Sequence, residues 1–418
     1  MTVHTAVASR CVGVVFVLAV VALHSGSASA EGSSDTAPPD RTGSSGTHRT
    51  ACDSASGRVL QVGSGKEYAT PSAAAVAARS GDVVKIMAGD FRGDVATWTT
   101  DRLTICGVGG RVRLFADGRS AQDKAIWVVT GSDITIDGVD FFDAKVPDQN
   151  GAGIRAQGGD LTVRNSGFFD NENGILGGDG AAVSIDRCEF ARNGAEDGQS
   201  HNIYVGFARR LTVTSSYFHE ARVGHNLKSR AKETRIENSY FMDGPKGTSS
   251  YLADFPSGGA VFLRGNLFHK GPNAENSTAI SFGAEGVKWP VNTFEMLHNT
   301  VVMTLSGGYF IAARPTTQSV RLTGNLFAGS GRPDLLTGGV SESKVLRKNN
   351  LMATADQFPG ADNVIAPRFW PTASLQARMA LAPDAVDPDY RADAPRPFAV
   401  RPIKPGPRLI GAIQSRPQ

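Results

Sequence analysis

The stretch HNIYVG (201–206), continued by LTVTSSYF (211–218), returns almost unchanged as GHNLKSR (224–230) and TRIENSYF (234–241). The two His-Asn pairs start 24 residues apart, and the two Tyr-Phe pairs start 23 residues apart. A fixed period in this range is typical of stacked repeats in which each copy forms one turn of a solenoid. Equivalent residues of neighbouring turns would then lie above one another at the inter-strand spacing of about 4.8 Å.

The period extends over most of the chain in two families of apolar positions. Short segments of alternating polarity precede many members of the first family, which are Phe141, Phe168, Phe190, Phe218, Phe241, Phe268, Val301, Phe327 and Met352. The second family falls between them, at Ile154, Ile175, Ile203, Leu227, Leu252, Ile280 and Phe310. Two or three short strands in each turn of roughly 25 residues indicate a parallel β-helix, because no such strand buries its apolar face alone.

We therefore predict an all-β fold, a parallel β-helix of about nine to eleven coils over residues 58–356. Leucine-rich repeats have similar periods, but their Leu-x-x-Leu-x-Leu pattern is absent, and a β-propeller needs longer blades. Residues 71–79 predict a short helix that would cap the N-terminal end. The proline-rich residues 357–418 are expected to form an irregular C-terminal cap or wrap of the same domain.

The N-terminal region indicates export. Residues 1–30 combine Arg10, an apolar run and a small-residue Ala-Ser-Ala site, which is typical of a signal peptide. Residues 31–57 are expected to be a disordered linker. We therefore expect a periplasmic or secreted protein, with no membrane association after cleavage, in which Cys52 can pair with Cys106 and Cys188 is packed in a strand.

The charge balance bears on partners. The chain has 43 basic and 40 acidic residues, a formal net charge of +3. This balance argues against a dedicated nucleic-acid binder, although it leaves room for a local basic cleft. We expect a monomer.

The repeat texture and the helix ahead of it resemble the right-handed parallel β-helix proteins of the pectate-lyase-like superfamily, over roughly Val59 to Ile413. That fold hosts polysaccharide lyases, polygalacturonase-type hydrolases, mannuronan epimerases and phage or adhesin modules. The nearest similarity is to the chondroitinase-B and alginate-lyase branch, which uses a Lys base with an Arg nearby. LKSR (227–230), followed by RIEN (235–238), is similar to its basic strand and the strand after it.

The resemblance implies an exported enzyme that cleaves uronic-acid polysaccharide by β-elimination. The calcium-holding acids of that branch have no clear match in this sequence, so we expect no cofactor, with Ca²⁺ as the one metal that the resemblance allows. The Asp-Asp pair of the hydrolases and the Asp-Pro-His-Asp of the epimerases are absent.

Alternation along the strands assigns the predicted catalytic residues to one face. If Leu227 points inward, Lys228 and Arg230 point outward, and Tyr204 lies one coil from Lys228. Arg230 is the expected carboxylate clamp, since its planar fork binds bidentately. Either Lys228 or one of the histidines (His201 or His225) is the expected base, and Tyr204 is the expected proton donor.

Four further residues are predicted to bind substrate: Asn202, Asn226, Tyr251 and Asp254. The two asparagines have a structural alternative, because Asn266, Asn299, Asn325 and Asn350 each stand two residues before an apolar anchor and indicate an internal ladder. The histidines can equally cap a corner of the coil, and Tyr217 and Tyr240 are interpreted as surface stacking.

Other functions remain open on the same fold. A hydrolase needs two carboxylates about 6.5–9.5 Å apart for inversion, and the acids near the predicted site (Asp179, Asp254 and Glu285) are sparse. An epimerase, or a carbohydrate-binding protein without turnover, is the further alternative. A converging cleft around Lys228 would favour an enzyme, and a flat row of Asn and Tyr would favour a binder.

Overall fold

The structure is a computed structural model, and it describes residues 50–330, 336–360, 371–379, 390–393, 399–402 and 409–412. The predicted signal peptide (1–30) and most of the predicted linker lie outside the described residues. Within the described ranges, no helix has the length and apolar character needed to cross a membrane.

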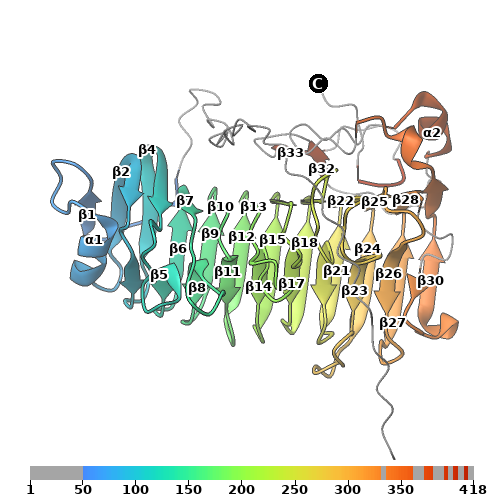
Figure 1. Cartoon of the computed structure of the whole chain (residues 1–418), viewed down its shortest axis with the longest axis horizontal. Coiled ribbons are helices and arrows are strands. Elements are labelled where there is room, and N and C mark those ends of the chain that lie inside the picture. The colour runs from blue at the N-terminus through green and yellow to red at the C-terminus, as the bar shows by residue number, and fades with distance from the viewer. Residues whose placement is uncertain are drawn as a thin grey trace, which may run out of the picture. The chain divides into compact units, whose positions relative to one another are not determined.

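The fold is an all-β parallel solenoid of about 11 turns with few helices, as predicted. Figure 1 shows its strands following one another from β1 to β30. Two parallel sheets form its walls, and we call the 21-stranded one sheet A and the ten-stranded one sheet B.

Most coils give two strands to sheet A, which consists of β1 (Val59–Val62), β2 (Val83–Arg92), β4 (Thr104–Phe115), β6 (Ile134–Asp137), β7 (Val139–Phe142), β9 (Leu161–Arg164), β10 (Gly167–Phe169), β12 (Ala182–Asp186), β13 (Glu189–Ala191), β15 (Arg210–Thr214), β16 (Tyr217–His219), β18 (Glu233–Glu237), β19 (Tyr240–Met242), β21 (Ala260–Arg264), β22 (Leu267–Lys270), β24 (Thr293–Leu297), β25 (Thr300–Met303), β27 (Ser319–Thr323), β28 (Leu326–Gly329), β30 (Val345–Lys348) and β31 (Leu351–Ala353). Sheet B consists of β3 (Ala96–Trp98), β5 (Ala125–Val129), β8 (Ala152–Ala156), β11 (Asn173–Gly177), β14 (Ile203–Val205), β17 (Leu227–Ser229), β20 (Ala253–Phe255), β23 (Thr278–Phe282), β26 (Tyr309–Ala313) and β29 (Leu336–Thr337). The remaining elements are α1 (Pro71–Ala77), α2 (Ala373–Arg378), the antiparallel pair β32 (Tyr390–Asp393) and β33 (Ala399–Pro402), and the 3-10 turns η1 (Ala51–Asp53), η2 (Glu342–Lys344) and η3 (Ala355–Gln357).

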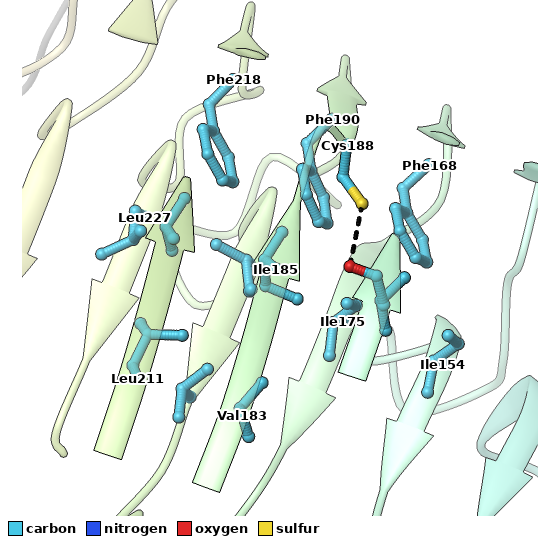
Figure 2. Close-up of a cluster of buried hydrophobic side chains, with 14 of the residues drawn as sticks. Ile154, Phe168, Ile175, Val183, Ile185, Cys188, Phe190, Leu211, Phe218 and Leu227 are labelled. Atoms are coloured by element: carbon cyan, nitrogen blue, oxygen red, sulfur yellow. Dashed lines mark hydrogen bonds between the residues drawn. The ribbon is translucent and has the colours of Figure 1, made fainter. Parts of the chain in front are cut away.

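The first family of apolar anchors is in register from coil to coil, as predicted. Phe168 pairs with Phe141 on one side and with Phe190 on the other, and the same match continues to Met352. The rings of Phe168 and Phe190 stack with centroids 4.6 Å apart, and those of Phe190 and Phe218 with centroids 4.7 Å apart. Figure 2 shows this stack facing the aliphatic side chains of the other strands across the interior. Stacking of equivalent side chains therefore builds one continuous core.

One corner of the coil repeats a backbone conformation. The residue three before each anchor has a positive φ, between 46° and 78°, and these residues are Gly138, Asn165, Arg187, Ser215, Asn238, Gly265, His298, Gly324 and Asn349. Left-handed backbone costs little for Gly and Asn but more for other residues. The bend separates the two sheet A strands of a coil, so each coil meets this backbone requirement at the same place.

The residue after this bend forms a polar ladder. Asn266 donates its side-chain amide to Asn299, and Asn299 donates to Asn325, each at 3.0 Å. Asn325 donates in the same way to Asn350, which confirms the predicted ladder. Ser166, Cys188, Ser216 and Ser239 take the equivalent position in earlier coils, where each of the two serines Ser216 and Ser239 accepts the backbone N–H of the preceding coil. The ladder side chains provide hydrogen-bond partners for buried polar groups, which apolar core residues cannot do.

Cys188 is a buried residue of this ladder, as predicted for a packed cysteine. Its Sγ donates weakly to the Val163 carbonyl at 3.4 Å, drawn as the dashed line in Figure 2.

The second family of anchors needs two corrections. Leu227 pairs with Ala253, not with Leu252, and Ile280 pairs with Ile311, not with Phe310. Leu252 and Ala253 are both fully buried, so apolar character alone could not tell which of them is in register. The shift matters for the site, because it places Asp254 directly beside Lys228.

The N-terminal end is tied down earlier than predicted. A disulfide joins Cys52 to Cys106, and η1 follows Thr50. The predicted linker (31–57) therefore does not extend to residue 57, because this bridge fixes its last part to β4. Helix α1 forms where predicted and buries Ala74 and Ala75 in the core, while its role as a cap stays a prediction.

Described parts of the C-terminal segment pack on the outer face of sheet A. Its described residues Phe358, Leu375, Met379, Ile410 and Ala412 form one apolar cluster with outward-facing residues of sheet A: Tyr217, Tyr240, Met242, Leu267, Val302, Leu326 and Ala328. The interpretation of Tyr217 and Tyr240 as surface residues is wrong, since the two are 2% and 1% exposed. Apolar residues on the outer face of β16 to β28 explain why these parts wrap there.

The ladder generates a stability prediction. Replacing Asn299 by alanine leaves its neighbours without partners, because its side chain joins Asn266, Asn325 and two backbone carbonyls. We expect Asn299→Ala to lower the free energy of unfolding by about 2–4 kcal/mol in urea denaturation. Asn350→Ala, at the partly exposed end of the ladder, is the control and should lower the free energy of unfolding clearly less. Equal losses would show that burial within the ladder does not determine how much each asparagine stabilises the fold.

Candidate functional site

Three outward-facing side chains of sheet B lie in register on consecutive coils. Tyr204 pairs with Lys228, which pairs in turn with Asp254. Because neighbouring strands are about 4.8 Å apart, the three side chains form a continuous row along the sheet. The predicted register of the two His-Asn repeats is therefore confirmed.

Lys228 and Arg230 bind the same carboxylate. Lys228 Nζ donates to Glu285 Oε1 at 3.1 Å, and the Arg230 guanidinium donates to Oε2 of the same side chain. The Lys228 and Arg230 side chains are 13% and 15% exposed, whereas Glu285, in the turn after β23, is 45% exposed. Burial raises the pKa of Glu285, but the hydrogen bonds from Arg230 and Lys228 outweigh it and keep the pKa below its usual value. The two cations form an anion site that holds the protein's own carboxylate.

The Arg230 guanidinium is fixed from several sides. Its Nε donates to the Tyr204 hydroxyl at 2.7 Å, and Nη1 donates to the Ser257 hydroxyl at 2.9 Å. Its Cζ lies 5.9 Å from the centroid of the Phe207 ring, and the Trp289 indole donates to the Arg230 carbonyl at 2.9 Å. Arg230 is therefore preorganised to bind a carboxylate.

Asp254 is the buried acid of the row. Its side chain is 4% exposed, and among the described residues its Oδ1 has no hydrogen-bond partner. Its Oδ2 lies 3.5 Å from Nε2 of His225. Burial raises the pKa of Asp254 to about 6, while the Lys228 cation and the Ser281 hydroxyl act in the opposite direction. A carboxyl that titrates near neutral pH in such a cluster is typical of a catalytic acid or base.

The two histidines do not have the predicted chemistry. His201 Nδ1 accepts the backbone N–H of His225 at 3.0 Å, and His225 Nδ1 accepts that of Tyr251 at 3.2 Å. Their rings stack with centroids 4.6 Å apart. Burial, reinforced by nearby cations, lowers the pKa of His201 to about 3 and that of His225 well below its usual value. The interpretation of either ring as the base is therefore wrong, because the unprotonated nitrogen is already occupied and the other carries the proton.

The prediction that Asn202 and Asn226 bind substrate is also wrong. Both side chains are fully buried, and Asn202 donates to Asn226 at 2.8 Å inside the coil. They belong to a second internal ladder, which consists of Asn171, Asn193, Asn202, Asn226 and Asp243. The structural alternative, an internal ladder, therefore explains Asn202 and Asn226, whose buried side chains hydrogen-bond other buried polar groups.

Tyr251 lies beside this row. Its ring centroid is 5.1 Å from that of His225, and its side chain is half-buried. Contact between Tyr251 and substrate stays a prediction.

A groove of about 470 Å³ opens on sheet B, next to Tyr204. Its floor includes Leu176 and Arg155, which precede Tyr204 in the outward row on the two previous coils. Phe207, which is 45% exposed, lies at its edge. The groove extends the cluster toward the N-terminal coils.

The site does not fit Ca²⁺, the metal that the family resemblance allows. Calcium takes about six to eight oxygen ligands, mostly carboxylates and carbonyls. Asp254 and Glu285 are the two acids here, and Lys228 and Arg230 already neutralise Glu285. Within the described ranges, no three His, Cys, Asp or Glu side chains are grouped to hold a metal ion.

Comparisons with known proteins agree with this fold. Residues 124–288 match the family described as the right handed beta helix region. No curated protein matches the sequence. The crystal structure of pectate lyase Pel9A is similar, at 14% sequence identity and a TM-score of 0.58, over 87% of this chain and 98% of that one. An alginate lyase from Paenibacillus sp. str. FPU-7 is 16% identical over 71% of this chain and 99% of that one, with a TM-score of 0.48.

The protein is therefore a right-handed parallel β-helix with the pectate-lyase-like fold. The matched segment contains the whole row from Tyr204 to Asp254 and the turn with Glu285.

Sequence reasoning missed Phe207, Trp289 and Arg155, and it considered Glu285 only as an acid of the hydrolase alternative. Glu285, Phe207 and Trp289 lie in connections between strands, where no repeat predicts position. Arg155 is in the repeat, but only the register of β8 with β11 shows that it faces the groove. Glu285 stands between Gly283 and Gly286, both with positive φ. These two glycines were the signal in the sequence that a turn places Glu285 there.

The buried carboxyl predicts a pH-dependent gain in stability. The pKa of Asp254 is raised to about 6 in the folded state, so the fold loses stability as the pH rises from about 4 to about 6, and the full penalty remains above pH 6. We expect Asp254→Asn to raise the free energy of unfolding by up to about 3 kcal/mol at pH 8 and to change it little at pH 4. Urea denaturation at both pH values measures this.

Asp160→Asn is the matched control with the opposite sign. A backbone N–H from Ala182 lowers the pKa of Asp160, despite partial burial, and Arg209 adds to this, so the variant should lose stability at pH 8. If Asp254→Asn loses stability at pH 8, the ionised carboxyl of Asp254 does not destabilise the folded protein.

Proposed function

We propose that this protein is an exported polysaccharide lyase that cleaves uronic-acid-containing polysaccharide by β-elimination. The observation that carries the proposal is the anion site of Lys228 and Arg230, beside the buried carboxyl of Asp254, whose Oδ1 has no hydrogen-bond partner among the described residues. A groove leads to this cluster, and the similar fold of a protein described as a pectate lyase supports the same class of substrate.

The first requirement of β-elimination is a neutralised uronate carboxylate, which makes the C5 proton acidic. Arg230 and Lys228 meet it, and Glu285 occupies the place of the substrate carboxylate in the free protein. Because Glu285 is far more exposed than either cation, its side chain can leave when a substrate carboxylate takes over its hydrogen bonds.

The second requirement is a base for the C5 proton. The sequence left open whether Lys228 or a histidine takes this role, and the structure favours Asp254 instead. Lys228 belongs to the anion site, because its Nζ donates to Glu285 Oε1 and it pairs in register with Asp254. Asp254 is ionised above about pH 6 and lacks a partner at Oδ1.

The third requirement is an acid for the departing O4. The Tyr204 hydroxyl accepts a hydrogen bond from Arg230, so its own proton is free to be donated elsewhere. In the proposed step, Asp254 takes the C5 proton, the C5–H electron pair forms the C4=C5 double bond, the C4–O4 bond breaks, and O4 takes the proton of Tyr204.

A glycoside hydrolase is the second candidate, because Asp254 and Glu285 have pKa values shifted in opposite directions. Such a pair can divide the roles of acid and base. The ion pairs that bind Glu285 to two cations argue against it. An unsaturated product distinguishes the lyase from the hydrolase, and from an epimerase or a binder.

Export is part of the proposal. The disulfide between Cys52 and Cys106 is what an oxidising compartment outside the cytoplasm permits, in agreement with the predicted signal peptide at residues 1–30.

The lyase proposal predicts a defined set of activities. Polygalacturonate, alginate and glycosaminoglycans would be incubated with the full chain, and the absorbance of the unsaturated uronate product followed. We expect Asp254→Asn and Lys228→Ala to lower kcat by roughly 10²- to 10⁴-fold, and Arg230→Ala to raise KM as well. The pH profile of kcat/KM should rise through about pH 6 and lose that limb in Asp254→Asn.

Lys232→Ala, an exposed lysine in the connection after β17, is the control and should remain fully active. Reducing ends without absorbance would support the hydrolase. Equal activity of all variants would remove the site assignment.

Glu285 gives an independent prediction. If it competes with the substrate carboxylate, Glu285→Gln should lower KM several-fold while kcat stays within about twofold, because the substrate no longer displaces a charged partner. Steady-state kinetics on the best polysaccharide of the panel measures this. A higher KM would mean that Glu285 positions the cations and does not compete.

A further inference from the structure

Arg155 differs from the other cations of the site. It is half-buried on β8, and its Nη1 donates to the Asn150 carbonyl at 3.5 Å. Among the described residues, no carboxylate lies within ion-pair distance of it, whereas Arg111, Arg192 and Arg230 each have one. Burial also lowers the pKa of Arg155. A partly buried guanidinium without an anion is unfavourable unless a ligand supplies the charge.

Its place in the outward row relates it to the proposed site. Arg155, Leu176, Tyr204 and Lys228 lie in register on four consecutive coils. Three steps of about 4.8 Å put the backbone of Arg155 about 14 Å from that of Lys228. A second anionic group would therefore bind at a distance that a short run of sugar units spans.

The groove beside Arg155 and Tyr204 suits a sugar chain. Leu176 forms an apolar floor, and Tyr204 and Phe207 supply aromatic surface on which the C–H faces of sugars can pack. Gln157 and Asp179 add polar groups, and the Asp179 carboxylate accepts the backbone N–H of Phe207 at the rim. Such a mixture of apolar floor and few polar groups is typical of ligand grooves.

The other direction along sheet B has no equivalent cation among the described residues. Beyond Asp254 the outward positions are taken by Ser281, Ala312 and Thr337. Charged recognition on this face is therefore one-sided, toward the N-terminal coils.

We propose that Arg155 is a specificity-determining residue that binds the carboxylate of a second uronate unit in a chain lying over Leu176 and Tyr204, so that the substrate is a polyuronide extending from Lys228 toward the N-terminal coils. This inference rests on the proposed function and deepens it, because it requires repeated carboxylates in one polymer.

The test compares wild type with Arg155→Gln on oligogalacturonates and oligoalginates of increasing length. Arg155→Gln should raise KM about ten- to a hundredfold for long oligomers and leave kcat unchanged, since this contact is the same in ground and transition states. The shortest cleaved oligomer, which does not reach Arg155, should show no difference. Arg235→Gln, an exposed arginine on sheet A, is the matched control and should behave as wild type.

A binding measurement separates this inference from the proposed function. Calorimetric titration of Asp254→Asn with the same oligomers, with and without Arg155→Gln, needs no turnover. Length-dependent loss of affinity in the double variant supports the Arg155 site even if no substrate is cleaved. Unchanged affinity for long oligomers, or an equal loss for all lengths, overturns it, whether or not the protein proves to be a lyase.

Discussion

In-register stacking of coils at one bend is the constraint on which the structure depends. Each coil places a left-handed residue at the bend and a ladder residue directly after it, as His298 and Asn299 do in the coil that contains Val301. The left-handed residue turns the chain, and the ladder side chain hydrogen-bonds the backbone of the coil before it. Because the bend and the ladder recur together, a slip of one residue would expose the Phe stack and orphan the ladder at once.

The same stacking creates the candidate site. Residues far apart in the chain, such as Tyr204 and Asp254, are brought within two strand spacings because they occupy one position of successive coils. Stacking also buries the carboxyl of Asp254, and this burial raises its pKa to about 6 although the neighbouring Lys228 cation acts in the opposite direction. A buried carboxyl with a raised pKa weakens the fold at neutral pH, which is understandable if its chemistry is needed.

The connections contribute what the repeat cannot. Glu285 comes from the turn after β23 and Trp289 from the longer segment that follows, and both converge on Arg230. Phe207 approaches the same guanidinium from the connection after β14. The rigid coils position the cations, while irregular segments orient Arg230 and supply the internal carboxylate. This division is common in proteins that carry a site on a regular scaffold.

The sequence alone determined the solenoid, the anchors from Phe141 to Met352 and the pairing of Tyr204 with Lys228, because periodic apolar residues have one way to be buried together. It could not decide between Leu252 and Ala253, since both are apolar, and so it missed that Asp254 lies beside Lys228. Only the tertiary structure separated Asn226, inside the coil, from Lys228, outside it. Burial, hydrogen-bond partners and the approach of Glu285 depend on contacts between distant segments, which no local pattern encodes.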